Sequence, residues 1–251
     1  MIITTDYVDI PVDGQMMRML VAAPKADGRY PGILLYSDIF QLTGPMIRAT
    51  MRLAGYGFVV AAPEIYHRIE PLGSAIAFDD AGRERGLADA AQTAVAEFDA
   101  DGRTVLDWLS QQPRVAAGQL GAGGFCIGGH LAFRAAMNPE VVAAACFYAT
   151  DIHKHSLGEG MNDDSLARAG DIKGELLHIW GRQDPHIPLE GRNLIKARLE
   201  EVGARFTWHE FNAAHAFMRD EGPRHDPALA RLCWELVLEL FHRRLGTGDL
   251  G

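Results

Sequence analysis

Short apolar runs without internal alternation limit the fold of this chain more than any other feature. Five of them occur at 32–36, 57–62, 120–125, 141–148 and 175–180, and a more mixed run occupies 205–211. A strand with one face in water alternates apolar and polar residues, whereas a strand buried on both faces does not. The runs therefore predict a sheet covered on both faces, which is typical of parallel strands.

Segments with helical periodicity separate the runs at 46–53, 95–109, 131–137, 189–202 and 227–245, although Gly102 interrupts the second. Alternating residues at 3–10 and 17–22 flank a turn and predict an N-terminal antiparallel hairpin. Strands that alternate with helices predict an α/β fold with a mostly parallel central sheet and helices on both faces. The glycine-rich segment 63–91 shows weak periodicity and is expected to lie over the top of the sheet. No repeat or linker divides the chain, so we expect one domain over residues 1–251.

Composition and charge exclude several classes of function. The net charge of −9 argues against a nucleic-acid or anionic membrane surface, since both need clustered Lys and Arg. Three widely spaced cysteines form no disulfide framework and favour a reducing compartment. The N-terminus lacks a signal-peptide pattern, and no stretch approaches the roughly 18 apolar residues of a membrane span. We therefore expect a cytoplasmic protein that binds neither nucleic acid nor membrane.

The sharpest chemical signal is the pattern G-F-C-I-G at residues 124–128, which lies between an apolar run and a helical segment. Strand, tight turn and helix are the setting of the G-x-S-x-G nucleophile elbow, here with Cys126 in place of serine. Glycines two residues to either side let the strained backbone and the helix approach closely. The partial positive charge of a helix N-terminus favours a thiolate. The alternative is a glycine-rich turn around an inert cysteine, and this pattern alone does not decide between them.

Two later residues favour the catalytic interpretation. Asp184 follows the run at 175–180, and His215 follows the run at 205–211. Nucleophile, acid and histidine in this order, each at the carboxyl end of a strand, is the chain order of α/β-hydrolases. Such a histidine accepts the thiol proton and returns it to the leaving group, while the acid holds the required tautomer. The sequence therefore predicts a Cys126, His215 and Asp184 triad on an α/β-hydrolase fold.

The loop after the first central strand is expected to complete the site. The backbone N–H of Ile39 in this loop, paired with that of Ile127, could hold a developing oxyanion. Asp38 beside it is either an ordinary loop carboxylate or a group that tunes the thiol.

The other histidines have simpler interpretations. His130 is expected to pack near the elbow, and it is the first alternative base should His215 not serve. His153 and His155 have no clear third ligand and indicate a solvated loop rather than a metal site. No metal and no cofactor are predicted.

At these residues the chain resembles the dienelactone hydrolase family, also called carboxymethylenebutenolidases, over about residues 30–245. The elbow around Cys126, the G-R-Q-D turn that ends at Asp184 and the A-H-A-F motif around His215 carry the resemblance. The resemblance implies that these three residues are nucleophile, orienting acid and base. It also implies hydrolysis of small enol-lactones that carry a free carboxylate, in bacterial breakdown of aromatic compounds, without a cofactor.

Further site residues follow from the resemblance alone. It implies two arginines that bind the substrate carboxylate: Arg219 matches one, and the other falls at Arg83 or Arg85, of which Arg83 fits better. It also implies a carboxylate at Asp38 that holds back the resting thiol and then helps to deprotonate it, although the family has the longer Glu there. Ala216 stands where the family commonly has a serine, which weakens the prediction of dienelactone itself.

Three functions remain open at this stage. The favoured one is cysteine-dependent hydrolysis of small esters or lactones, with an anionic substrate. A broader carboxylesterase or thioesterase on the same scaffold is the second, and a non-catalytic small-ligand binder that kept the elbow is the third. The expected partner is a small ester or lactone, and the expected assembly is a monomer or a small homo-oligomer.

Overall fold

A computed structural model describes residues 1–246, and the last five residues of the predicted domain lie outside the described part. The chain begins with the predicted hairpin, formed by β1 (Ile3–Val12) and β2 (Gln15–Pro24). The turn between them consists of Asp13 and Gly14, with φ angles of 49° and 83°. Positive φ at both central residues matches the right-handed twist of the flanking strands, which explains why Asp-Gly joins them.

The remaining strands extend this hairpin into one eight-stranded sheet with the order β1-β2-β4-β3-β5-β6-β7-β8. β2 pairs with β4 in antiparallel fashion, and every pair from β4 to β8 is parallel. The fold prediction is therefore confirmed, with strand limits close to the apolar runs. The strands are β3 (Tyr30–Tyr36), β4 (Val59–Pro63), β5 (Val115–Phe125), β6 (Val141–Phe147), β7 (Glu175–Gly181) and β8 (Arg205–Phe211).

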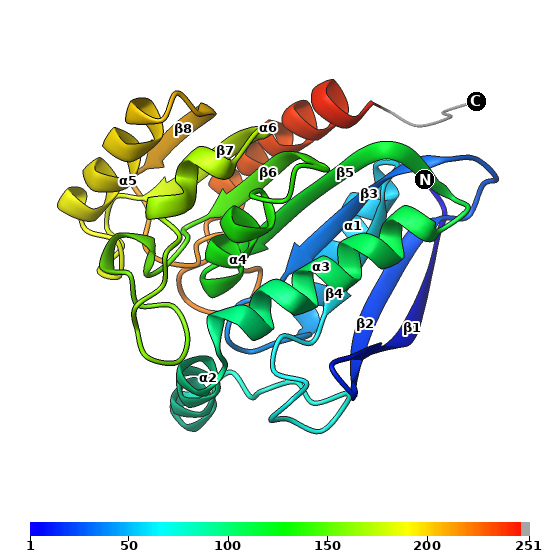
Figure 1. Ribbon diagram of the computed structural model, residues 1–251, viewed down its shortest axis with the longest axis horizontal. Helices are drawn as coiled ribbons and strands as arrows, with labels where there is room; N and C mark the ends of the chain where they lie inside the picture. Colours follow the sequence, from blue (N-terminus) through cyan, green and yellow to red (C-terminus); the bar gives the residue numbers. More distant parts are fainter. Residues whose placement is uncertain (247–251) are drawn as a thin grey trace.

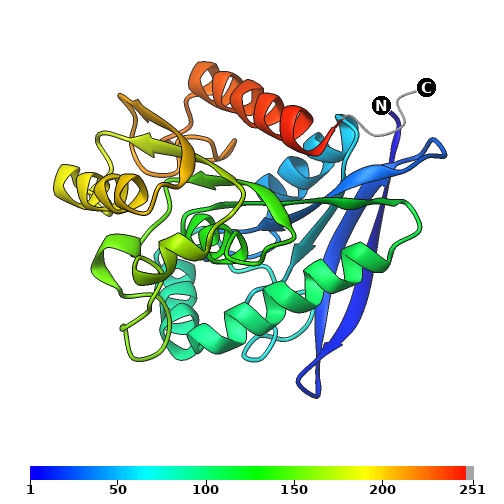
Figure 2. The same ribbon diagram turned by 45° about the horizontal axis from the view of Figure 1, so that its top comes forward.

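Helices cover both faces of the sheet (Figures 1 and 2). α3 and α4 pack on one face, against β3 and β5, while α1 and α6 pack on the other, against β2, β4 and β5–β7. Every helix of residues 1–246 is too short or too polar to span a lipid bilayer. The helices are α1 (Gly44–Gly55), α2 (Asp80–Gln92), α3 (Val95–Gln111), α4 (Ile127–Ala135), α5 (Leu189–Glu201) and α6 (Pro227–Leu245).

Helix α2 is not predicted by the sequence, whose glycines suggested an irregular segment. The structure shows why glycine is compatible with a helix here. A Cβ on Gly86 would lie 2.4 Å from the carbonyl oxygen of Ile39, and one on Gly82 would lie 1.9 Å from that of Ala77. Gly86 lets α2 lie directly against the loop that follows β3, beside the candidate oxyanion residue Ile39, and Gly82 lets the segment just before α2 pass close to the first turn of the helix. Gly102 acts similarly in α3, where a Cβ would lie 2.3 Å from the Tyr36 hydroxyl.

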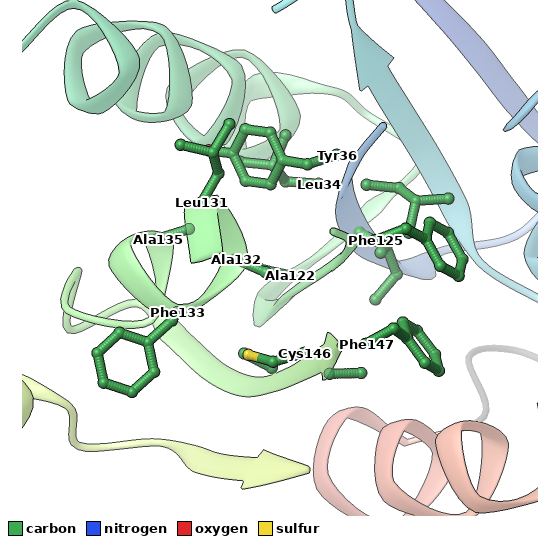
Figure 3. Packing of buried hydrophobic residues seen from close by; sticks show 14 of the residues in the cluster. Leu34, Tyr36, Ala122, Phe125, Leu131, Ala132, Phe133, Ala135, Cys146 and Phe147 are labelled. Atoms are coloured by element: carbon green, nitrogen blue, oxygen red, sulfur yellow. The ribbon is translucent and has the colours of Figure 1, made fainter. Parts of the chain in front are cut away.

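The core on the two sides of β5 and β6 is dense and aromatic near the carboxyl ends of the strands. Figure 3 shows Phe125 and Phe147 together beside α6, with their rings stacked at a centroid distance of 4.7 Å. On the opposite face, Phe133 and Leu131 of α4 are almost fully buried. Because protein interiors are close-packed, these contacts fix the height and direction of the turn between β5 and α4.

A buried arginine joins α4 to its neighbours. The side chain of Arg134 is 3% exposed and donates to Asp99 on α3 at 2.8 Å and 2.6 Å. It also donates to Asp164 at 2.7 Å and to the hydroxyl of Ser165 at 2.8 Å. Removing one partner from such a buried network leaves the others without compensation. Arg134 therefore helps to hold the helix that carries the elbow.

We expect Arg134→Met to lower the free energy of unfolding by about 2 kcal/mol, because several charge-assisted hydrogen bonds are lost at a buried position. Urea denaturation followed by circular dichroism measures the change. Arg231→Met is the matched control, since Arg231 and its partner Glu235 are both exposed and such pairs contribute at most about 1 kcal/mol. Equal effects of the two substitutions would contradict a structural role for Arg134.

Candidate active site

Cys126 occupies a strained turn between β5 and α4. Its φ of 60° and ψ of −122° are unfavourable for any residue with a Cβ, and this is typical of a nucleophile elbow. The flanking glycines permit the turn, because a Cβ on Gly124 would lie 2.0 Å from the carbonyl oxygen of Gly128. A Cβ on Gly128 would lie 2.2 Å from that of Ser37, in the loop after β3. The G-x-C-x-G pattern therefore has the geometry that the sequence predicts for it.

Backbone hydrogen bonds hold the strained residue in place. The N–H of Cys126 donates to Phe147 at 3.0 Å, and its carbonyl accepts from Gly129 at 3.0 Å and from Thr150 at 3.3 Å. A strained conformation persists only where the surroundings over-determine it. The thiol is thus presented from a rigid position rather than from a mobile loop.

His215 and Asp184 meet although they are separated in the sequence. Their side chains are 6% and 1% exposed, and His215 Nδ1 lies 2.6 Å from Asp184 Oδ2. Asp184 follows β7, and His215 follows β8, so neighbouring parallel strands bring them to one edge of the sheet. Burial lowers the pKa of His215, but the Cys126 side chain and Asp184 raise it more strongly, to about 9. Of the interactions that raise this pKa, the one with Cys126 is the largest.

The predicted oxyanion groups lie on either side of this elbow. Ile127 begins α4. Ile39 lies in the loop after β3, and Ser37 in the same loop lies against Gly128. Across residues 1–246, the backbone N–H groups of Ile39 and Ile127 donate to no protein acceptor. Two free backbone donors near a nucleophile are suited to bind an oxyanion.

Asp38 is bound to Arg219, a contact that the sequence does not predict. Arg219 donates to Asp38 Oδ2 from Nε at 3.1 Å and from Nη2 at 2.6 Å. The other oxygen of Asp38 accepts from the Phe40 N–H at 3.0 Å. The Arg219 guanidinium also lies 4.0 Å from the ring centroid of Phe78. Both side chains are mostly buried, so this ion pair is a fixed part of the site wall.

The two alternatives for a second arginine have different surroundings. Both lie on α2 and are exposed. Arg85 is bound through Nε and Nη2 to the buried carboxylate of Glu70. Arg83 has no ion pair with a carboxylate among the described residues. Arg83 is therefore the one whose guanidinium is available to a ligand, although no contact joins it to Arg219.

Three aromatic residues near the candidate triad are not identified by sequence reasoning. Tyr148 follows β6 with a φ of 38°, and its ring lies edge-on to that of His215 at 5.1 Å. The His186 ring lies 4.7 Å from that of His215, and its backbone N–H donates to Asp184 Oδ1 at 2.9 Å. Tyr66 follows β4, and its buried hydroxyl has no hydrogen-bond partner in the described structure. Only their positions in the sequence could have indicated these three residues, because each follows the carboxyl end of a strand or lies within two residues of Asp184.

The alternative base and the candidate metal site can be placed as well. His130 Nε2 lies 2.7 Å from the hydroxyl of Ser165 and 3.4 Å from Asp163, so its ring is held by the segment before α5. His153 lies against Gly191 on α5. Among residues 1–246, no group of three or more His, Cys, Asp or Glu side chains is arranged to hold a metal ion.

The chain is similar to known proteins along most of its length. Residues 17–245 match the model of the dienelactone hydrolase family. A putative carboxymethylenebutenolidase from Saccharomyces cerevisiae is 39% identical, over 100% of this chain and 95% of its own length. The carboxymethylenebutenolidase of Pseudomonas sp. strain P51 is 26% identical, over 90% of both chains.

A solved structure extends the likeness to three dimensions. The crystal structure of a putative dienelactone hydrolase from Klebsiella pneumoniae has a TM-score of 0.83 and 25% identity, and the match covers 96% of this chain and 99% of that one. Its similarity includes the α/β-hydrolase sheet described above. The chain belongs to the dienelactone hydrolase family and is an enzyme that hydrolyses ester or lactone bonds.

Proposed function

We propose that the protein cleaves small ester or lactone bonds through a Cys126, His215 and Asp184 triad and a thioester acyl-enzyme. The observation that carries the proposal is the combination of a strained Cys126 and a buried His215–Asp184 pair at one edge of the sheet. Asp184 is bound to Nδ1, which leaves Nε2 of His215 for the thiol. The interaction of Cys126 with the imidazole supports the same assignment.

Because Cys126 and Asp184 raise the pKa of His215 to about 9, the thiol proton resides on His215 Nε2 before acylation begins. The thiolate attacks the carbonyl carbon, and the carbonyl electron pair moves to oxygen, where the N–H groups of Ile39 and Ile127 bind it. When the carbonyl re-forms, the C–O bond to the leaving oxygen breaks, and His215 protonates that oxygen. In a lactone the released alcohol or enol stays attached to the acyl group, because both belong to one ring.

Deacylation repeats these steps with water. His215 takes a proton from water, the hydroxide attacks the thioester carbonyl, and the C–S bond breaks. The proton on His215 returns to the sulfur, and the product leaves as a carboxylic acid. Asp184 holds the ring in the same tautomer throughout and stabilises the imidazolium, so it needs no proton of its own.

The substrate is proposed to be an anion, with Arg219 as its main charge partner. A guanidinium binds a carboxylate bidentately and stays charged at all working pH values. Arg219 is held by Asp38 at the site wall, and an incoming carboxylate would compete with Asp38 for the same donors. A broader esterase that accepts neutral esters is the second candidate, because Asp38 already neutralises Arg219 and Ala216 offers no hydroxyl.

Cys126→Ala is expected to lower kcat by at least about a thousandfold, because no other group can form the acyl-enzyme. Turnover of a lactone and of a nitrophenyl ester measures the loss, and mass spectrometry of the quenched enzyme should find the acyl group on the peptide that carries Cys126. Cys233→Ala is the matched control, since this thiol is buried in α6. Near-normal turnover by a folded Cys126→Ala protein would disprove the proposed nucleophile.

His215 is expected to titrate near pH 9 in the unmodified protein and lower in Cys126→Ala, which removes the largest favourable interaction with the imidazolium. NMR of the 13C-labelled ring follows the titration. Because the pKa of His215 is raised on folding from 6.5, its contribution to stability is complete below pH 6.5 and is lost as the pH rises through 9. Urea unfolding across this range should show that loss. An identical titration in both proteins would remove Cys126 as the partner of His215.

An acidic lactone should have a higher kcat/KM than its neutral methyl ester, by about tenfold or more if one charge-assisted pair is formed. Arg219→Ala should erase this preference chiefly through KM, because the pair positions the substrate before reaction. Arg83→Ala tests the second arginine, and Arg85→Ala is its matched control because Arg85 is bound to Glu70. Equal kcat/KM for acid and ester in the unmodified enzyme would favour the general esterase.

A further inference from the structure

A cavity of about 400 Å3 opens between α1 and α6, on the face of the sheet opposite α3 and α4. The cavity borders the candidate active site along one wall only, which is formed by Asp38, Arg219 and Tyr148. Cys126 and His215 are not among its lining residues. Asp38 and Arg219 belong to the proposed substrate site as well, but the proposed reaction assigns no role to the rest of this cavity. The size of the cavity falls within the range of sites for small molecules.

Part of the inner surface of the cavity is apolar and formed by side chains from several elements. This apolar part includes Met46 of α1, Phe125 of β5, Met218 in the loop before α6, and Trp234 of α6. These side chains are each less than 10% exposed. The ring of Phe125 lies 6.1 Å from that of Trp234, and Figure 3 shows Phe125 next to Phe147 in the core. A surface of this kind accepts an aromatic or aliphatic group, and the flexible methionines can adapt to its shape.

The charge of the lining is opposite to that of the whole chain. Arg48, Arg52, Arg219 and Arg231 line the cavity together with only two carboxylates, those of Asp38 and Asp220. The chain as a whole carries a net charge of −9. A cationic lining on an acidic protein attracts an anionic ligand to this position rather than to the general surface.

Three of these arginines already have carboxylate partners. Arg219 is paired with Asp38, Arg48 with Asp220 and Arg231 with Glu235. Arg52 differs, because it forms no ion pair or hydrogen bond with any residue of the described chain. Its guanidinium lies 5.4 Å from the ring centroid of Trp234, at the edge of the apolar surface. The guanidinium of Arg52 therefore lies beside the apolar part of the cavity, and no carboxylate of the described chain is paired with it.

We propose that this cavity is a second ligand site, which binds a small amphipathic carboxylate. The apolar body of the ligand, an aromatic ring or a short aliphatic chain, lies between α1 and α6 against Met46 and Trp234. Its carboxylate accepts from the guanidinium of Arg52, which supplies two parallel donors. The apolar part determines where the ligand lies, and the ion pair selects an acid over a neutral compound of the same shape.

The test measures binding of 4-phenylbutyrate and of its neutral amide to the full-length Cys126→Ala protein by isothermal titration calorimetry. The acid should bind about tenfold or more tightly than the amide, as expected for one charge-assisted contact. Arg52→Gln should remove this difference and leave binding of the amide unchanged. Arg231→Gln is the matched control, because Arg231 lines the same cavity but is paired with Glu235, and it should change neither affinity by more than about twofold.

A second variant tests the location of the ligand. Ala49 of α1 lines the cavity, and Ala49→Phe should fill it and remove binding of both compounds. Ala230→Leu fills the cavity from the side of α6, and it replaces Ala49→Phe in this test if that variant does not fold. The proposal is overturned if neither compound binds, or if Arg52→Gln leaves the preference for the acid intact. It is also overturned if binding survives both cavity-filling changes but is lost when the thiol of the unmodified protein is carbamidomethylated, because the ligand then lies over Cys126.

Discussion

The strained backbone at Cys126 is the constraint on which the rest of the site depends. A residue with φ of 60° and ψ of −122° is held there because β5 and α4 are packed on both sides and the backbone of Phe147 and Thr150 binds its peptide groups. The flanking glycines bring the loop after β3 within contact of α4. The same close approach brings the loop that carries Ile39 against the first turn of α4, which begins at Ile127.

Two acid–base pairs at this edge of the sheet have different consequences. In the His215–Asp184 pair the acid is almost fully buried and raises the pKa of the imidazole, which suits a base that must be held in one orientation. In the Arg219–Asp38 pair the carboxylate accepts two hydrogen bonds from the guanidinium and one from the Phe40 N–H. A direct action of Asp38 on the thiol would have to compete with these three bonds.

Sequence reasoning recovered most of the architecture because burial leaves a strong pattern. Strands buried on both faces must be apolar throughout, and this is why the predicted limits of β6 and β7 agree with the structure to within one residue. Helix α2 was missed because its glycines suggested an irregular segment, whereas Gly86 makes room for the backbone of Ile39, which is distant in the sequence. The contacts of Tyr148 and His186 with His215 also escaped detection, since an aromatic residue at a strand end carries no periodic signal.

The sequence by itself determined the strand and helix order, the elbow and the order of Cys126, Asp184 and His215, because each depends on neighbours along the chain. Only the tertiary structure decided which charged groups pair. Arg219 binds Asp38 from the far end of the chain, Arg85 is bound to Glu70, and Arg52 has no carboxylate partner in the described residues. Pairing depends on the distance between side chains brought together by the sheet and its helices, and that distance is not encoded in local spacing.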